Sequence, residues 1–147
     1  MEICDYLWYN LVEVKRKRGS PVRLKNILIV VNDIELSKEF YQELFGLRVV
    51  TDFGENVILS EGLVLQEKKI WEQITGKSVT AGGNDAELYF EEYNLGAFVQ
   101  KLNSSRFPIR YVNELMEPSL EPSVIRIYDP DEHIIEIREQ TLERKMR

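Results

Sequence analysis

The sequence predicts an α+β protein in which two βαβββ modules together form an eight-stranded pair of sheets. A strand, a helix and three further strands follow one another in this order twice along the chain. An offset of 61 residues sets Asn26 against Glu87 and Asp33 against Asn94. Hardly any residues are identical at this offset, so the repeat is one of architecture, and each module is incomplete without the other.

The first module spans about residues 22–76. Its opening run, LKNILIVV, is short and rich in Ile and Val, which predicts a largely buried strand. Asn32 and Asp33 offer an N-cap for the helix IELSKEFYQELF, which Gly46 ends as a C-cap. The segments LRVVTDF, NVILS and LVLQE then predict three short strands, and KKIWEQITG predicts a short helix.

The second module spans about residues 84–139. A strand in AELYFEE leads to Asn94, the candidate N-cap of an amphipathic helix, and IRYVNEL, SVIRIY and HIIEI predict three more strands. The apolar side chains of the helix that are expected to face inward are Leu95, Phe98, Val99 and Leu102. Residues 1–20 are predicted to be an N-terminal extension, and residues 140–147 a C-terminal tail.

Composition excludes several classes of function. The chain of 147 residues has a net charge of −6, whereas phosphate binding needs clustered Lys and Arg, so nucleic acid is not an expected partner. The basic run at 15–18 stands beside a Gly-Ser-Pro breaker and is interpreted as a solvated linker rather than a nucleic-acid address. No apolar run approaches the roughly 18 residues of a membrane span. Cys4 is the sole cysteine and the N-terminus lacks a basic start, which favours a cytoplasmic protein.

Three motifs carry a resemblance to a known family. They are Val31-Asn32-Asp33 after the first strand, Phe40-Tyr41 with Phe45-Gly46-Leu47 in and after the helix, and the closing YDPDEHIIEI. In this order and at this spacing, residues 22–139 resemble the vicinal oxygen chelate superfamily, which includes glyoxalase I, bleomycin-resistance and fosfomycin-resistance proteins and extradiol dioxygenases. The resemblance implies mixed sheets that curl around a cavity, and it implies a homodimer.

The resemblance also implies four positions for metal ligands. They fall on Asn26, on Gln66 or its neighbour Leu65, on Glu87 and on Glu136. Metal-dependent members usually carry His at the first and third of these positions, and this chain does not. Oxygen donors alone suit Mg²⁺, Mn²⁺ or Ca²⁺ better than Zn²⁺, Ni²⁺ or Fe²⁺. We therefore predict no transition-metal cofactor, with a divalent metal bound by these residues as the alternative.

Glu136 has two interpretations. Its carboxylate is flanked by isoleucines, and in the first interpretation it is a cavity-facing metal ligand or a general base that could share a proton with Glu87. In the second it pairs with a nearby arginine such as Arg126 or Arg138, or is exposed at a sheet edge. His133 lies an odd number of positions away and next to the turn, so we expect it to point to the opposite face, near solvent.

The turn before that strand departs from the family pattern. Glu132 stands where the D-P-D-G pattern has glycine, and a different turn there would shift the register of Glu136.

Tyr89, Trp71, Arg126 and Asn26 are the candidate ligand-binding residues. Tyr89 shares a strand face with Glu87, and Trp71 lies in the segment that joins the two modules. Three functions remain open at this point: a metal-free module that binds a small organic molecule, a divalent-metal-dependent lyase, isomerase or dioxygenase, and a ligand-sensing domain that residues 1–20 connect to a partner.

Overall fold

The computed structural model describes residues 21–113 and 123–140, which fold into two four-stranded sheets with three helices among them. The predicted N-terminal extension, 1–20, and all but the first residue of the predicted C-terminal tail lie outside the described residues. No helix in the described ranges is long and apolar enough to cross a membrane.

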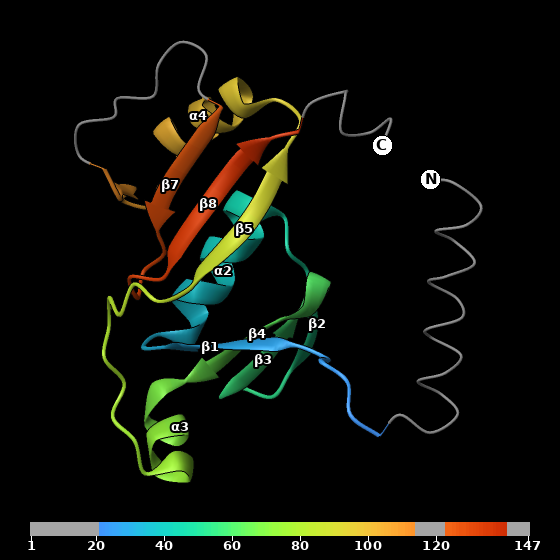
Figure 1. The fold of residues 1–147 in the computed structure, drawn as a ribbon, viewed down its shortest axis with the longest axis vertical. Helices are drawn as coiled ribbons and strands as arrows, with labels where there is room; N and C mark the ends of the chain where they lie inside the picture. The colour runs from blue at the N-terminus through green and yellow to red at the C-terminus, as the bar shows by residue number, and fades with distance from the viewer. Residues whose placement is uncertain (1–20, 114–122, 141–147) are drawn as a thin grey trace.

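The first module forms a mixed sheet in the order β1-β4-β3-β2, in which β1 runs parallel to β4 and the other pairs are antiparallel (Figure 1). A short 3₁₀ turn at Ser60–Gly62 connects β3 to β4. The elements are β1 (Ile27–Val31), α2 (Ile34–Phe45), β2 (Val49–Asp52), β3 (Asn56–Leu59), β4 (Leu63–Glu67) and α3 (Lys68–Thr75).

The second module repeats this arrangement as β5-β8-β7-β6, with β5 parallel to β8. Its elements are β5 (Glu87–Glu92), α4 (Leu95–Asn103), β6 (Arg110–Tyr111), β7 (Val124–Tyr128) and β8 (Ile134–Glu139). The predicted α+β fold with two βαβββ modules is therefore confirmed, and the two mixed sheets are open rather than closed barrels.

The predicted helix caps are present. The Asp33 side chain accepts a hydrogen bond from the N–H of Leu36, and the Asn94 side chain accepts one from the N–H of Ala97. Gly46 ends α2 with a left-handed φ of 66°, a conformation that glycine adopts without steric penalty.

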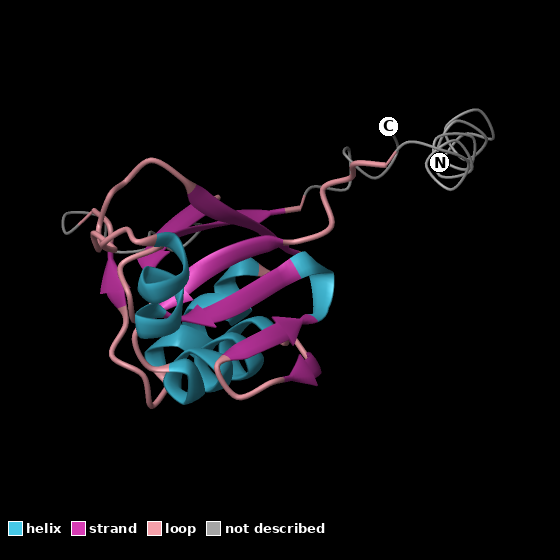
Figure 2. Ribbon diagram, turned by 90° about the horizontal axis from the view of Figure 1, so that it is seen from below, coloured by secondary structure: helices cyan, strands magenta, loops and turns pink. Residues whose placement is uncertain are grey.

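Helix α2 lies between the two sheets (Figure 1), and its buried face is part of the core. Figure 2 shows helices packed between the strands of the two sheets. One face of α2 packs on β3 and β4, and the ring of Phe45 stacks on Phe90 of β5 with centroids 4.4 Å apart. Phe40 is 2 % exposed and meets Phe107 edge to face. These aromatic contacts join the two modules into a single core.

A hairpin of the second module is also tied to α2 of the first. The buried hydroxyl of Tyr41 donates a hydrogen bond of 2.7 Å to Asp129, and the N–H of Asn32 donates one of 2.9 Å to Asp131. Glu132 takes a left-handed φ of 67°, so the turn keeps the backbone geometry that the glycine of the family pattern would adopt. The register expected for Glu136 is therefore retained, directly opposite Tyr89 and Arg126.

Replacing Tyr41 by Phe tests the tie between the modules. The Tyr41→Phe variant should lose about 1–3 kcal/mol of unfolding free energy, because a buried carboxylate oxygen loses a donor that water cannot replace. Chemical denaturation measures the loss. Tyr89→Phe, on a half-exposed side chain, is the matched control and should change stability by less than about 0.5 kcal/mol. Equal effects of the two substitutions would contradict the account.

Candidate functional site

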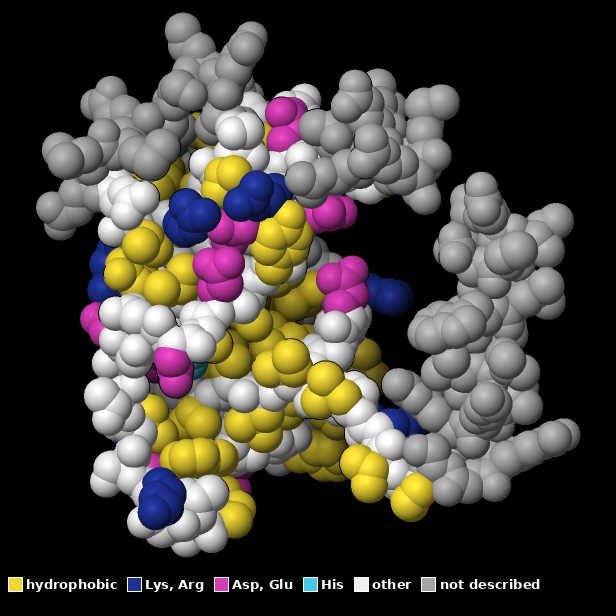
Figure 3. Space-filling model, viewed as in Figure 1, with side chains coloured by type: hydrophobic (Ala, Val, Ile, Leu, Met, Phe, Trp, Pro, Cys, Tyr) yellow, Lys and Arg dark blue, Asp and Glu magenta, His cyan; other side chains and the backbone are white. Residues whose placement is uncertain are grey.

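A cavity of about 1010 Å³ opens where the two modules meet, and we call it the seam cavity. Its lining comes from β1, from α3, from residues 78–86 between α3 and β5, and from the hairpin at 128–134. Figure 3 shows hydrophobic side chains gathered over β1 and α3, and charged side chains interleaved over the sheet of β5 and β8. The cavity thus brings together segments that are far apart in the sequence.

The inner lining of the seam cavity is mainly apolar. Leu28 and Val30 of β1, Trp71 of α3 and Val79 of the connecting segment all contribute to it. Leu28 is 42 % exposed and belongs to β1, the edge strand of the first sheet that borders the cavity. An apolar lining with aromatic side chains is typical of small-molecule sites.

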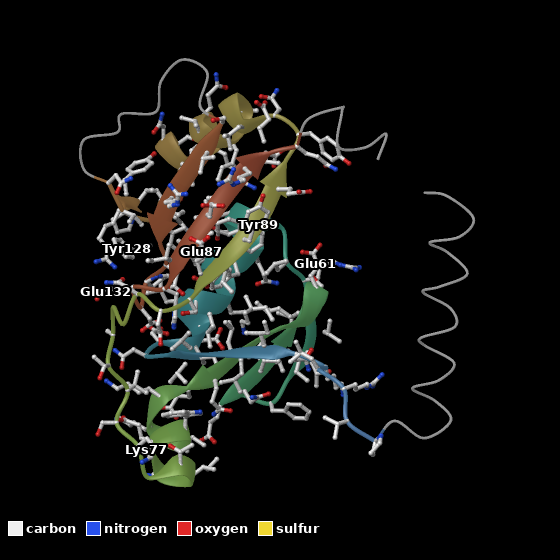
Figure 4. The ribbon with its side chains drawn as sticks, viewed as in Figure 1. Glu61, Lys77, Glu87, Tyr89, Tyr128 and Glu132 are labelled. Atoms are coloured by element: carbon white, nitrogen blue, oxygen red, sulfur yellow. The ribbon has the colours of Figure 1, made fainter. Side chains whose placement is uncertain are left out.

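The rim of the cavity is charged. The cavity lining includes five acidic side chains against two basic ones; the acidic ones are Asp85, Glu87, Asp129, Asp131 and Glu132, and the basic ones are Lys68 and Arg110. Figure 4 shows Tyr128, Glu132 and Glu87 near the hairpin end of the second sheet, with Tyr89 farther along β5.

The Arg110 side chain, at the hairpin end of the cavity, is fixed by three neighbouring groups. The Arg110 guanidinium lies 3.5 Å from Glu132, donates a hydrogen bond to the backbone oxygen of Asp129 and covers the ring of Tyr128.

The connecting segment passes closely by the hairpin. A Cβ on Gly82 would lie 2.7 Å from the Oε2 atom of Glu132, and Gly82 also has a φ of 70°. Glycine at this position therefore lets the segment close one side of the cavity. At its other end the N–H of Val79 donates a hydrogen bond of 3.1 Å to Glu72 of α3.

The structure separates the residues that the sequence singled out. Trp71 and Glu87 line the seam cavity, whereas Asn26, Gln66, Tyr89, Arg126 and Glu136 do not. Tyr89 does share a sheet face with Glu87, as strand parity predicted. Both Tyr89 and Arg126 lie directly opposite Glu136 on that face. Glu87 lines the cavity at the hairpin end of this sheet face, together with Tyr128 and Ile134, whereas Glu136 lies farther along the same face. Of Asn26, Glu87 and Glu136, which were expected to converge on one hollow, the cavity lining therefore includes Glu87 alone.

Glu136 is the partner of two arginines, which is the second of its two interpretations. It is 3 % exposed, and its oxygens lie 2.6 Å from the Arg126 guanidinium and 2.8 Å from that of Arg138. The Arg138 guanidinium, joined by that of Arg126, lowers the pKa of Glu136 although burial alone would raise it. A carboxylate stabilised in this way is a poor general base, and it faces cations where a metal ion would have to bind.

The other family positions are no better arranged for a metal. The Gln66 side chain accepts a hydrogen bond of 2.8 Å from Asn56 and donates one of 3.1 Å to the backbone oxygen of Glu55. Within residues 21–113 and 123–140, no group of three or more His, Cys, Asp or Glu side chains is placed to hold a metal ion. The donors present therefore do not fit the metal centre that the superfamily implies.

Asp129 lies at the centre of a buried hydrogen-bond network that was not predicted from the sequence. The Asp129 side chain is fully buried, and its Oδ1 accepts the N–H groups of Asp131 and His133, each at 2.9 Å. Its Oδ2 lies 2.7 Å from the Tyr41 hydroxyl and 2.7 Å from Nδ1 of His133. His133 does flank the turn, as predicted, but its half-buried imidazole is bound to Asp129 and also lines the seam cavity.

A local signal could have indicated this network. An aspartate at the start of a tight turn accepts N–H groups from the residues that follow it, and Asp129 stands four residues before His133. The prediction for His133 rested only on its spacing from Glu136 along the strand. The turn instead brings the His133 imidazole back to the Asp129 carboxylate.

The ion pairs of Glu136 predict a pH dependence of stability. A lowered pKa means that the stabilisation is present above the ordinary value of 4.5 and is lost as the pH falls through the lowered folded value. The unfolding free energy of the wild type should therefore exceed that of Glu136→Gln near neutral pH, and the gap should close in acid. Glu55→Gln, on an exposed carboxylate in the turn between β2 and β3, is the control and should show no such gap. A gap for Glu136→Gln that does not vary with pH would contradict the assignment.

Comparison with known proteins places the chain in a family. A family model described as a glyoxalase-like domain matches residues 24–142, and no curated protein matches the chain. A solved structure of a protein of unknown function from Agrobacterium tumefaciens is 30 % identical, with a TM-score of 0.65, covering 82 % of this chain and 95 % of that one.

Two further solved structures share the fold. A glyoxalase-related enzyme from Fulvimarina pelagi is 21 % identical, with a TM-score of 0.64, covering 80 % of this chain and 88 % of that one. A glyoxalase/bleomycin resistance protein/dioxygenase family enzyme from Burkholderia phytofirmans is 18 % identical, with a TM-score of 0.63, covering 80 % and 98 %. With its repeated βαβββ architecture and the family model that matches most of its length, the chain belongs to the glyoxalase-like domain family of the vicinal oxygen chelate superfamily.

Proposed function

We propose that this protein binds a small organic molecule in the seam cavity and does so without a transition metal. The observation that carries the proposal is the cavity itself. Its volume of about 1010 Å³ lies at the upper end of the range, roughly 300–1,000 Å³, of small-molecule sites. Its apolar lining and few charged groups have the composition that such sites need to bury a ligand and fix its orientation.

The lining also indicates the kind of molecule. The indole of Trp71 and the ring of Tyr128 are both part of the cavity and favour a ligand with a flat apolar or aromatic body. Acidic side chains outnumber basic ones at the rim, which disfavours a ligand that carries a net negative charge. A neutral or cationic molecule with an aromatic body fits these two features best.

The arrangement of Glu136 supports a metal-free site over the metal-dependent alternative. A lyase, isomerase or dioxygenase that used a divalent metal would need the Glu136 carboxylate free to coordinate it, and two guanidinium groups hold that carboxylate instead. A role as a ligand-sensing domain rests on residues 1–20, which lie outside the described residues. The homodimer and the cytoplasmic location stay predictions.

Fluorescence of Trp71 tests the proposal. In a Trp8→Phe background Trp71 is the only tryptophan, and it lines the cavity. Titration with neutral and cationic aromatic compounds should give saturable quenching for at least one of them, because a bound ring would contact the indole. Calorimetry on the same compound then gives the dissociation constant.

Two matched substitutions show whether binding takes place in the cavity. Leu28→Arg puts a charge into the cavity lining and should weaken ligand binding about tenfold or more. The control variant, Val50→Arg, puts the same charge on the exposed strand β2, at the opposite edge of the first sheet from β1. Val50→Arg should leave binding unchanged. Absence of quenching by every compound, or equal loss in both variants, would contradict the proposal.

Metal titration separates the two functions. Calorimetry of chelator-treated protein with Mn²⁺ and with Zn²⁺ should show no binding that depends on Glu136, because Arg126 and Arg138 already neutralise its carboxylate. Stoichiometric metal uptake that Glu136→Gln abolishes would favour the metal-dependent enzyme instead.

A further inference from the structure

His133 is the single histidine of the chain, and it lines the seam cavity. Its side chain is 29 % exposed, and its Nδ1 lies 2.7 Å from the fully buried Oδ2 of Asp129. An imidazole has two ring nitrogens with different roles, and the partner of one of them decides what the other can do.

The Asp129 carboxylate fixes the proton of this imidazole. A carboxylate only accepts hydrogen bonds, so Nδ1 must carry the proton that lies between the two groups. Three further donors hold the same carboxylate: the hydroxyl of Tyr41 and the N–H groups of Asp131 and His133. With Nδ1 protonated and oriented, the neutral ring keeps its free electron pair on Nε2.

The charged surroundings strengthen the basicity of His133. Burial lowers the pKa of His133, but the hydrogen bond and the charge of Asp129, together with the charge of Asp131, outweigh burial and raise it overall. Tyr41 of α2 faces the same carboxylate, and Arg110 of β6 reaches the hairpin through Glu132 and the backbone oxygen of Asp129. Lys68 and Glu87 are the charged groups that α3 and β5 contribute to the cavity.

We propose that His133, oriented by Asp129, is the proton-accepting group of the seam cavity, and that the bound molecule is an aromatic compound with an acidic hydroxyl. In the proton-transfer step the ligand O–H bond breaks and its electron pair stays on oxygen. The Nε2–H bond forms, which leaves an imidazolium beside an oxyanion. The molecule therefore enters the cavity neutral, and the ion pair that it forms with His133 carries no net charge. The inference rests on the proposed function, since it names the chemistry of the molecule that the cavity would bind.

The pair of probes p-nitrophenol and nitrobenzene tests the inference, because they share a ring and differ in the acidic hydroxyl. Wild-type protein should bind p-nitrophenol about tenfold more tightly than nitrobenzene, the effect of one added hydrogen bond to a charged group. Bound p-nitrophenol should also show phenolate absorbance at a pH at which the free compound is protonated.

The variant His133→Asn isolates Nε2. The asparagine amide can replace the Nδ1–H donor to Asp129, so the hairpin contact is kept while the proton acceptor is removed. His133→Asn should bind both probes equally and should show no phenolate absorbance. An unchanged preference and an unchanged absorbance in the variant would overturn the inference.

Nitrogen NMR of the wild type avoids dependence on how the variant folds. The free protein should show the Nδ1–H form of neutral His133 at alkaline pH. At a lower pH, at which free p-nitrophenol still carries its proton, adding p-nitrophenol should raise the imidazolium fraction of His133. A proton on Nε2 in the free neutral ring, or no change on binding, would contradict the inference. Tight binding of nitrobenzene alone would overturn the inference and leave the proposed function standing, whereas binding of neither probe would count against both.

Discussion

The buried carboxylate of Asp129 is the interaction on which the rest of the structure depends. It belongs to the hairpin of the second module, yet one of its donors is the Tyr41 hydroxyl on α2 of the first module. Backbone N–H groups hold its other oxygen, so the charge is compensated only when the hairpin is closed and docked on α2. The hairpin, β1 and α3 in turn all line the seam cavity, which the 78–86 segment closes on another side. Packing of Phe40 and Phe45 against the second module adds apolar burial to this polar tie.

The fold places two groups of ionisable side chains in very different surroundings. On the open face of the second sheet, Glu136 occupies the position of a superfamily metal ligand. The positive charge that compensates its carboxylate comes from Arg126 and Arg138 instead of a metal ion. At the hairpin, the buried Asp129 supports an imidazole that lines the cavity. Chemistry in this protein is therefore expected at the junction of the modules, with protein side chains in place of a metal. The protein therefore shares its fold with the family, whereas its chemistry depends on its own side chains.

Much of the fold could be predicted from the sequence, and less of the site. Apolar periodicity located the strands and helices, and Asp33, Gly46 and Asn94 marked the helix ends because capping depends on local backbone geometry. Strand parity placed Tyr89 on the face of Glu87, and the sequence offered Arg126 or Arg138 as a possible partner of Glu136. Only the packed structure shows that both guanidinium groups pair with the Glu136 carboxylate. The network of Tyr41, Asp129 and His133 joins residues 88 and 4 positions apart. Such convergence depends on how the modules dock, and periodicity carries no information about docking.

Mapping of amide chemical-shift changes by NMR tests the central claim most directly, with a neutral aromatic compound added to the full chain. The account predicts that the largest changes fall on Leu28, Trp71 and the hairpin around His133, which surround the seam cavity. Changes confined to Tyr89, Arg126 and Arg138, on the open face of the second sheet, would contradict it. In that case the ligand would bind at the position of the superfamily metal site, and the seam cavity would not be the functional site.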